Sequence, residues 1–263
     1  MLLTVDIGNS NIVLGLYEES TLLQTFRVAS VRERGADEYA VLLVELLALK
    51  DIGRANVTAA IIGSVVPVLG VTLGHAIERA FGVEALQVSP TLNLGMPVLY
   101  ETPRELGVDR LLNAIAAFER VNGPAIVVDF GTATKLDCVS PKGEYMGGAI
   151  APGVRTSLDG LIERTAKLSQ VELSAPTRTL GRNTTHALQS GVIFGHAAMV
   201  DGMVERLQID LGYKCHVIAT GGLAGLIAEH AKRVNELEPN LTLEGLRILH
   251  ARNAAPARGS VAP

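Results

Sequence analysis

Two short turns in this sequence carry the residue types that hold phosphate groups. Each follows a run of apolar residues and has a glycine two positions after an aspartate: Asp6-Ile-Gly-Asn-Ser-Asn11 and Asp129-Phe-Gly-Thr-Ala-Thr134. Glycine lets the backbone approach a phosphate closely, and backbone N–H groups and the hydroxyls of Thr132 and Thr134 are donors for its oxygens. The carboxylate can hold a cation beside the phosphates. We interpret both turns as phosphate loops.

The spacing of the two turns indicates an internal duplication. Asp6 and Asp129 lie close to half a chain length apart in a sequence of 263 residues. A lone Asp-x-Gly is a common turn, but here each copy is followed by a second extended stretch and a polar hairpin tip. The matched context predicts a duplicated α/β domain, with one phosphate loop from each half.

Composition excludes several classes of protein. The chain is 48% apolar with a mean hydropathy of +0.31, which is enough for a sizeable core. It has no Trp, 4% aromatic residues and a net charge of −4, which argues against a nucleic-acid partner. No apolar stretch reaches membrane-spanning length, and the opening strand leaves no room for a signal peptide. Cys138, Cys215 and the six histidines show no metal-ligand spacing. We expect a soluble cytoplasmic protein with reduced thiols and no membrane partner.

The first half reads as three strands followed by alternating helices and strands, which predicts a mixed sheet. Helical spacing of apolar residues predicts helices at 36–50 and 70–81. β-branched and apolar runs predict strands at 58–66 and 85–88.

A helix at 105–119 is expected to join the halves, after an irregular stretch at 90–103 that contains Tyr100. Asp109 and Arg110 fall in the first turns of this helix, beside Gly107. By spacing alone they are either a solvated charge pair or part of a site.

The second half repeats the scheme with an insertion. Helices are predicted around 157–165 and 191–207, with Thr184 or Thr185 as a helix N-cap. The glycine-rich stretch 147–153 indicates a place where bulky side chains would obstruct a neighbour. A strand is predicted at 246–249. The expected domains are 1–118 and 119–252, followed by a disordered tail at 253–263.

The turn Thr220-Gly-Gly222 follows the strand after residue 215 and precedes a helix. Paired glycines at this place let the backbone pack against a flat ligand such as adenine, or accept phosphate at the helix N-terminus. The alternative is a tight turn without a ligand.

Five motifs in this order resemble those of type III pantothenate kinases: the two Asp-x-Gly turns, Gly107-Val-Asp-Arg110, Gly147-Gly-Ala-Ile-Ala-Pro-Gly153 and Thr220-Gly-Gly222. That family belongs to the actin-like, acetate and sugar kinase superfamily. The resemblance implies an α/β fold of two duplicated ribonuclease-H-like (actin-like ATPase) domains with mixed sheets. It also implies ATP-dependent phosphorylation of pantothenate, the first step of coenzyme A biosynthesis, by a homodimer.

The resemblance also implies roles for individual residues. Asp109 is the expected general base, and Asp129 the expected ligand of a monovalent cation, K⁺ or NH₄⁺, with Mg²⁺ arriving on ATP. The residues expected to bind ATP are Asp6, Ile7, Gly8, Asn9, Ser10, Asn11, Ile12, Val13, Thr132, Gly221 and Gly222. The residues expected to bind pantothenate are Tyr100, Gly107, Val108, Asp109, Arg110 and Thr184.

Lys135 departs from the family pattern, which has a small hydroxyl residue at this position. The lysine could reach the phosphates, point into solvent, or partly replace the monovalent cation. We expect Lys135 to lie on the face opposite Asp129, which disfavours replacement.

Two other functions stay open at this point. One is a kinase of the same superfamily with another small substrate. The other is a non-catalytic accessory regulator that binds ATP or pantothenate, as some relatives are described. The presence of Asp109, Asp129 and Thr132 favours catalysis.

Overall fold

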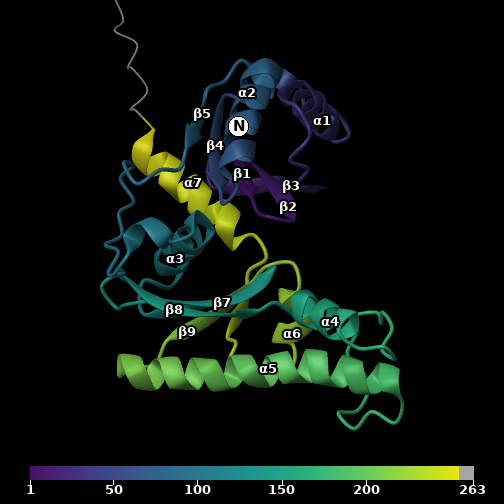
Figure 1. Cartoon of the computed structure of the whole chain (residues 1–263). Helices are drawn as coiled ribbons and strands as arrows, with labels where there is room; N and C mark the ends of the chain where they lie inside the picture. The colour runs from purple at the N-terminus through teal and green to yellow at the C-terminus, as the bar shows by residue number, and fades with distance from the viewer. Residues whose placement is uncertain (255–263) are drawn as a thin grey trace, which may run out of the picture. The chain divides into compact units, whose positions relative to one another are not determined.

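The computed structural model describes residues 1–254 of the chain. These residues form two compact units that interleave in the sequence (Figure 1). Unit 1 comprises Met1–Gly95, Leu106–Ala116 and the described residues from Thr242 onward; unit 2 comprises Met96–Glu105 and Ala117–Leu241. The sequence predicts a single boundary between residues 118 and 119, whereas the chain crosses between the units several times.

Unit 1 is built on a five-stranded mixed sheet with the order β3-β2-β1-β4-β5. Strands β1 to β3 pair antiparallel, while β4 pairs parallel with β1 and β5 parallel with β4. The strands are β1 (Leu2–Ile7), β2 (Asn11–Glu18), β3 (Thr21–Ala29), β4 (Ala59–Ser64) and β5 (Ala85–Gln87). The predicted order of strands and helices in the first half is confirmed.

Helices cover both faces of this sheet. Helices α1 (Ala36–Ala48) and α2 (Pro67–Phe81) pack on one face over the main apolar core of unit 1. A second cluster lies on the other face, where Ile61 of β4 contacts apolar residues of α3 (Val108–Val121) and α7 (Leu241–Asn253). Two short 3₁₀ turns, Arg54–Asn56 and Pro103–Glu105, complete the connections.

The strand predicted at 246–249 is wrong, because these residues belong to helix α7. Leu243, Leu246 and Leu249 recur every three residues and are buried in the second cluster. A short apolar run does not distinguish a buried strand from one turn of a buried helix. The predicted tail therefore starts inside α7 at residue 253, and residues 255–263 lie outside the described part of the chain.

Unit 2 repeats the sheet of unit 1 strand for strand, in the order β10-β9-β6-β7-β8. Strands β6 to β8 pair antiparallel, and β9 and β10 continue parallel from β6. The strands are β6 (Ala125–Phe130), β7 (Ala133–Val139), β8 (Tyr145–Pro152), β9 (His216–Thr220) and β10 (Glu236–Leu237). Identical order and strand direction in both sheets confirm the predicted duplication.

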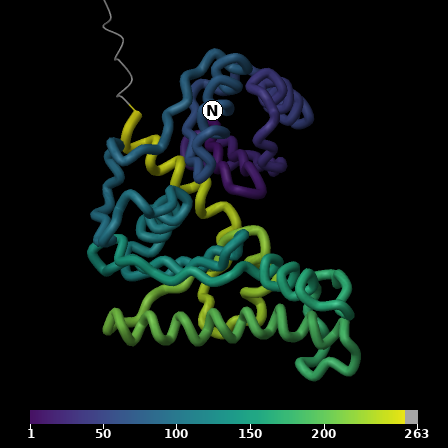
Figure 2. Tube along the Cα trace, viewed as in Figure 1, coloured from purple at the N-terminus to yellow at the C-terminus, as the bar shows by residue number. Residues whose placement is uncertain are grey.

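Three helices pack on one face of the second sheet: α4 (Val154–Glu163), α5 (Thr184–Leu211) and the short α6 (Ala224–Ala228). Figure 2 shows α5 as one long rod in green. The predicted caps Thr184 and Thr185 are wrong, because Asn183 caps α5 and its side-chain oxygen accepts a hydrogen bond from the His186 N–H at 2.8 Å. Asparagine ranks above threonine at this position.

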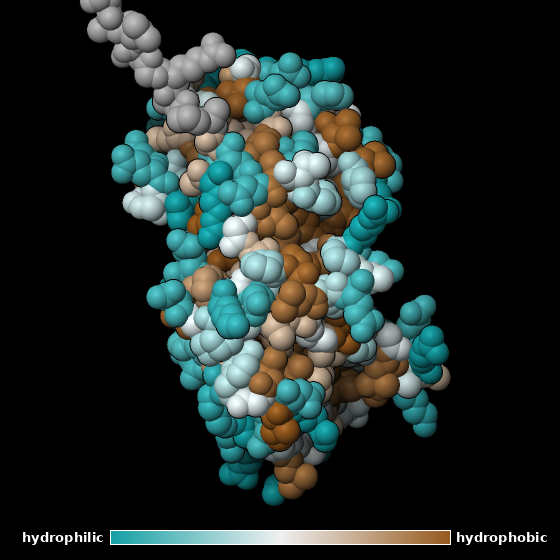
Figure 3. All heavy atoms as spheres, turned by 90° about the vertical axis from the view of Figure 1, so that its left-hand side faces the viewer, coloured by the Kyte–Doolittle hydropathy of each residue, from teal (hydrophilic) through white to brown (hydrophobic). Residues whose placement is uncertain are grey.

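The surface mixes hydrophilic and hydrophobic residues on the face drawn in Figure 3. Leu99, Met146 and Ile150 are exposed apolar residues on or beside the edge strand β8 of unit 2. Within residues 1–254, none of the helices has both the length and the apolar character that crossing a membrane requires.

Candidate functional site

The first predicted phosphate loop is the turn between β1 and β2 of unit 1. The Gly8 N–H donates to the Asn11 carbonyl oxygen at 2.9 Å, and the Ser30 hydroxyl donates to the Gly8 carbonyl oxygen at 2.7 Å. Ile7 and Ile12 are buried on either side, so they can offer a ligand only their backbone. These hydrogen bonds and buried side chains fix the base of the loop, whereas Asn9, Ser10 and Asn11 are exposed.

The second predicted loop, between β6 and β7 of unit 2, has the same construction. The Gly131 N–H donates to the Ala133 carbonyl oxygen at 3.1 Å. Thr132 is exposed, whereas Thr134 is completely buried. Thr132 is therefore available as a donor to phosphate, and the prediction of such a role for Thr134 is wrong. The strand alternation turns the side chain of Thr134 into the core.

The Thr220-Gly-Gly turn lies beside this second loop. Asp129 and Thr220 are partners in the parallel pairing of β6 with β9, so the two turns begin at the same edge of the sheet. Gly221 has a φ of +95°, and a Cβ there would lie 2.5 Å from Asp129 Oδ1. Only glycine fits this conformation and this close approach. Ligands of open α/β sheets bind at such carboxyl ends of strands.

The glycine-rich stretch 147–153 supports the same loop from the start of α4. A Cβ at Gly153 would lie 2.6 Å from the Gly131 carbonyl oxygen, and the Thr156 hydroxyl donates to the Thr132 carbonyl oxygen at 2.7 Å. The expectation that a side chain in this stretch would obstruct a neighbour is confirmed at Gly153, where the obstructed neighbour is the turn at Gly131 and Thr132.

Lys135 lies on the same face as Asp129. Its Nζ is 2.7 Å from Asp129 Oδ2, and the two side chains are only 15% and 13% exposed. The prediction that they lie on opposite faces is wrong, because the two residues are six positions apart, and an even separation along an extended chain already places both side chains on one face. The register decides: the two residues are directly opposite partners of an antiparallel pair, which share a face.

Tyr100 is held at the edge of unit 2. The Leu99 N–H donates to the Tyr145 carbonyl oxygen at 2.9 Å, and the Tyr145 N–H donates to the Pro97 carbonyl oxygen at 2.8 Å. The rings of Tyr100 and Tyr145 meet edge to face with centroids 6.0 Å apart. A Cβ at Gly147 would lie 3.7 Å from the Tyr100 ring. The segment 96–105 is thus fastened to β8 and positions Tyr100.

Gly107, Val108, Asp109 and Arg110 lie in unit 1 at the start of α3. Asp109 Oδ1 accepts a hydrogen bond from the Arg110 N–H at 2.9 Å, and a Cβ at Gly107 would lie 2.6 Å from the same oxygen. The Arg110 residue is only 6% exposed, so the alternative of a solvated charge pair is wrong.

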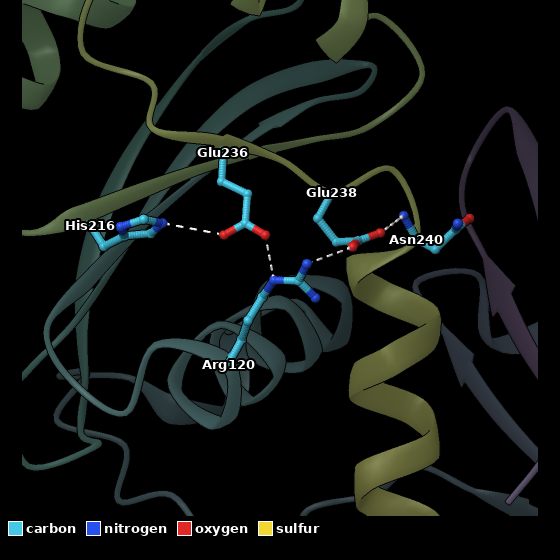
Figure 4. A network of polar contacts seen from close by, with 5 residues as sticks. All are labelled: Arg120, His216, Glu236, Glu238 and Asn240. Carbon is cyan, nitrogen blue, oxygen red and sulfur yellow. Dashed lines mark hydrogen bonds and ion pairs between the residues drawn. The ribbon is translucent and has the colours of Figure 1, made fainter. Parts of the chain in front are cut away.

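A polar network that the sequence patterns do not predict joins the end of α3 to β9 and β10 in unit 2 (Figure 4). The Arg120 guanidinium lies between two glutamates: its Nε is 2.5 Å from Glu236 Oε1, and its Nη2 is 3.2 Å from Glu238 Oε2. His216 Nε2 lies 3.2 Å from Glu236. Burial raises the pKa of Glu236, but hydrogen bonds from Arg120 and His216 outweigh it and leave that pKa below its ordinary value. No local pattern links residues so distant in sequence.

Comparison with known proteins identifies the family. The family model described as type III pantothenate kinase matches residues 2–206. The type III pantothenate kinase of Myxococcus xanthus is 46% identical over 97% of this chain and 100% of its own length. That of Anaeromyxobacter sp. strain Fw109-5 is 49% identical over 96% and 100%.

The chain belongs to the type III pantothenate kinase family.

Solved structures similar to this family member confirm the predicted fold class. A putative 2-dehydro-3-deoxygalactonokinase from Sinorhizobium meliloti superposes with a TM-score of 0.58 at 15% identity, covering 100% of both chains. A conserved putative Baf family transcriptional activator from Campylobacter jejuni gives 0.57 at 20% identity, covering 95% of this chain and 97% of its own. At these identities the likeness concerns the fold alone.

Two groups of predicted site residues can now be placed in this family member. Unit 2 brings together Asp129, Thr132, Gly221 and Lys135, and it also holds Tyr100 and the exposed Thr184 at the first position of α5. Unit 1 holds the Asp6 turn and the start of α3. Among the described residues, no three His, Cys, Asp or Glu side chains form a group that could bind a metal ion.

Proposed function

We propose that this chain transfers the γ-phosphoryl group of ATP to the hydroxyl of pantothenate, giving 4'-phosphopantothenate and ADP. This is the first step of coenzyme A biosynthesis. Membership of the type III pantothenate kinase family carries the proposal. The two Asp-x-Gly turns of the duplicated sheets support it, because phosphoryl transfer depends mostly on positioning and on neutralising phosphate charge.

ATP is the ligand of the turns at strand ends. The turn of residues 6–13 and the turn that carries Thr132 offer backbone N–H groups and hydroxyls to the phosphates. Gly221 and Gly222 are the residues expected to meet adenosine, because a glycine lets a flat ligand approach its backbone. Mg²⁺ accompanies ATP and supplies further positive charge to its phosphates.

Asp109 is the general base. As the hydroxyl oxygen of pantothenate bonds to the γ-phosphorus, the bond from that phosphorus to the bridging oxygen of ADP breaks, and Asp109 accepts the hydroxyl proton. Gly107, Val108, Arg110, Tyr100 and Thr184 are the pantothenate-binding residues. The guanidinium of Arg110 suits either the pantothenate carboxylate or a phosphate.

The monovalent cation expected at Asp129 fits poorly with the residues around that carboxylate. Lys135 already places an ammonium group 2.7 Å from Oδ2, and the backbone at Gly221 approaches Oδ1 closely. An added ion of the same charge would compete with the lysine for one carboxylate. No step of the proposed reaction uses such an ion.

The proposed enzyme is a cytoplasmic homodimer, as the family resemblance implies. Three exposed apolar residues on or beside β8 are compatible with a covered surface: Leu99, Met146 and Ile150. Size-exclusion chromatography with light scattering measures the mass directly. A mass of one chain at micromolar concentration would refute the dimer.

The role of Asp109 is tested by Asp109→Asn in an assay of ADP release with ATP, Mg²⁺ and pantothenate. We expect kcat to fall by about 10²–10⁴-fold while ATP binding is retained, since the variant loses only the proton acceptor. Asp210→Asn, an exposed position near the end of α5, is the matched control and should leave kcat unchanged. Near-normal turnover of Asp109→Asn would remove Asp109 from the base role.

A further inference from the structure

We propose that Lys135 is a built-in monovalent cation: its ammonium group takes the place at Asp129 that K⁺ or NH₄⁺ is expected to occupy, so turnover does not depend on either ion. The inference rests on the proposed kinase activity and concerns one residue of that site. It begins from the ion pair between Lys135 Nζ and Asp129 Oδ2, 2.7 Å apart.

The backbone fixes this pair in place. Asp129 and Lys135 are directly opposite partners in the pairing of β6 with β7, so their side chains leave the sheet on one face at adjacent positions. Both side chains are largely buried, at 13% and 15% exposure. A largely buried carboxylate next to a fixed lysine is neutralised without recruiting an ion from solution.

The ion pair of Asp129 and Lys135 lies directly beside the predicted phosphate loop. Asp129 is the penultimate residue of β6, and Gly131 and Thr132 form the turn that follows directly. On the other side, Gly221 of the Thr220-Gly-Gly turn approaches Asp129 Oδ1. The ammonium of Lys135 therefore lies beside both turns proposed to meet ATP, where positive charge favours bound phosphate.

The first half of the chain shows that a lysine is not required by this hairpin. In the equivalent pairing of β1 with β2, the residue opposite Asp6 is Val13, which carries no charge. The duplicated hairpin thus also forms with an apolar residue opposite its aspartate. Because the strand pairing does not need a lysine, we assign Lys135 to balancing the negative charge of Asp129 and of the bound phosphate.

The first experiment measures the wild-type rate with tetramethylammonium chloride, KCl or NH₄Cl as the only added salt. ADP is quantified directly by chromatography, because coupling enzymes have cation requirements of their own. We expect rates that agree within about twofold across the three salts, since the fixed ammonium stands in for a dissolved ion. Turnover that needs KCl or NH₄Cl would overturn the proposal whether or not any variant folds.

The second experiment removes the ammonium. For Lys135→Ala in tetramethylammonium chloride we expect a rate loss of about 10²-fold or more, because one preorganised charge is lost. We also expect saturable recovery with KCl or NH₄Cl, since the variant removes the lysine charge from Asp129 and leaves room for an ion in its place. Lys135→Met fills that space without charge and should stay slow in every salt. A Lys135→Ala enzyme that is active and indifferent to the cation would contradict the role of Lys135.

Lys142→Ala is the matched control, because Lys142 is exposed at the hairpin tip after β7. It should behave as the wild type in all three salts. A purely structural role for Lys135 predicts lower thermal stability of the variant and no rescue by ions. If the wild type releases no ADP with pantothenate in any salt, the proposed function fails, and the role of Lys135 fails with it.

Discussion

At the scale of single residues, the site depends on close approaches that side chains would prevent. Gly221 packs its backbone against Asp129 and Phe130, and Gly153 packs against the turn at Gly131. The sequence pattern predicts each glycine turn separately, because Asp-x-Gly and Thr-Gly-Gly are local signals. It does not predict that Gly221 and Asp129 touch, since that contact follows from the pairing of β6 with β9.

We expect Gly221→Ala to damage the site and the stability of unit 2. The new Cβ would lie 2.5 Å from Asp129 Oδ1, at a φ of +95° that alanine rarely adopts. Such strain costs about 1–3 kcal/mol, with weaker ATP binding as Asp129 is displaced. Denaturant unfolding and ATP titration measure both effects. Gly225→Ala in α6, where a Cβ meets no atom within 4 Å, should not weaken either, and equal results for the two variants would contradict this account.

At the scale of elements, local sequence signals predict which segments form helices or strands. The pairing of the strands then decides which residues lie close together. The helix at 36–50 and the strand at 85–88 are confirmed nearly to their ends as α1 and β5. The strand at 246–249 is wrong because a four-residue apolar run fits either structure. The prediction for Lys135 is wrong because its separation of six residues from Asp129 is even, so both strand alternation and the hairpin register place the two side chains on one face.

We expect Asn183→Ala to destabilise α5, because Asn183 accepts the His186 N–H at 2.8 Å as its N-cap. Losing such a cap costs about 1 kcal/mol. Thr185→Ala changes the neighbouring exposed position and should leave the free energy of unfolding nearly unchanged. Urea unfolding of both variants tests the assignment. A larger loss for Thr185→Ala would show that the threonine is the cap after all.

Glu236 makes the junction of α3 with β10 sensitive to acid. Because its pKa is lowered in the folded chain, the network contributes stability above the ordinary value of 4.5, and this contribution is lost as pH falls through the lowered pKa. We expect Glu236→Gln to lower the thermal midpoint at pH 7, and the difference from wild type to shrink as pH falls below 4.5. A difference independent of pH would mean that the charge of Glu236 contributes nothing.

At the scale of the whole molecule, duplication explains why the Asp-x-Gly turn occurs twice in one chain. The two sheets share strand order and direction, so the same hairpin recurs at the same place in each unit. This symmetry is predictable from sequence, because both copies keep the Asp-x-Gly signal. Contacts such as that of Arg120 with Glu236 are not predictable from sequence. The two residues are 116 positions apart, and no local pattern around either one indicates the other as its partner.

The most direct test of the central claim is detection of the product. Purified protein is incubated with ATP, Mg²⁺ and pantothenate, and the mixture is analysed by mass spectrometry for 4'-phosphopantothenate. The account predicts one phosphorylated pantothenate for each ADP released, and none without ATP. Bound ATP with no phosphorylated pantothenate would contradict it, and would favour another substrate or a regulatory role.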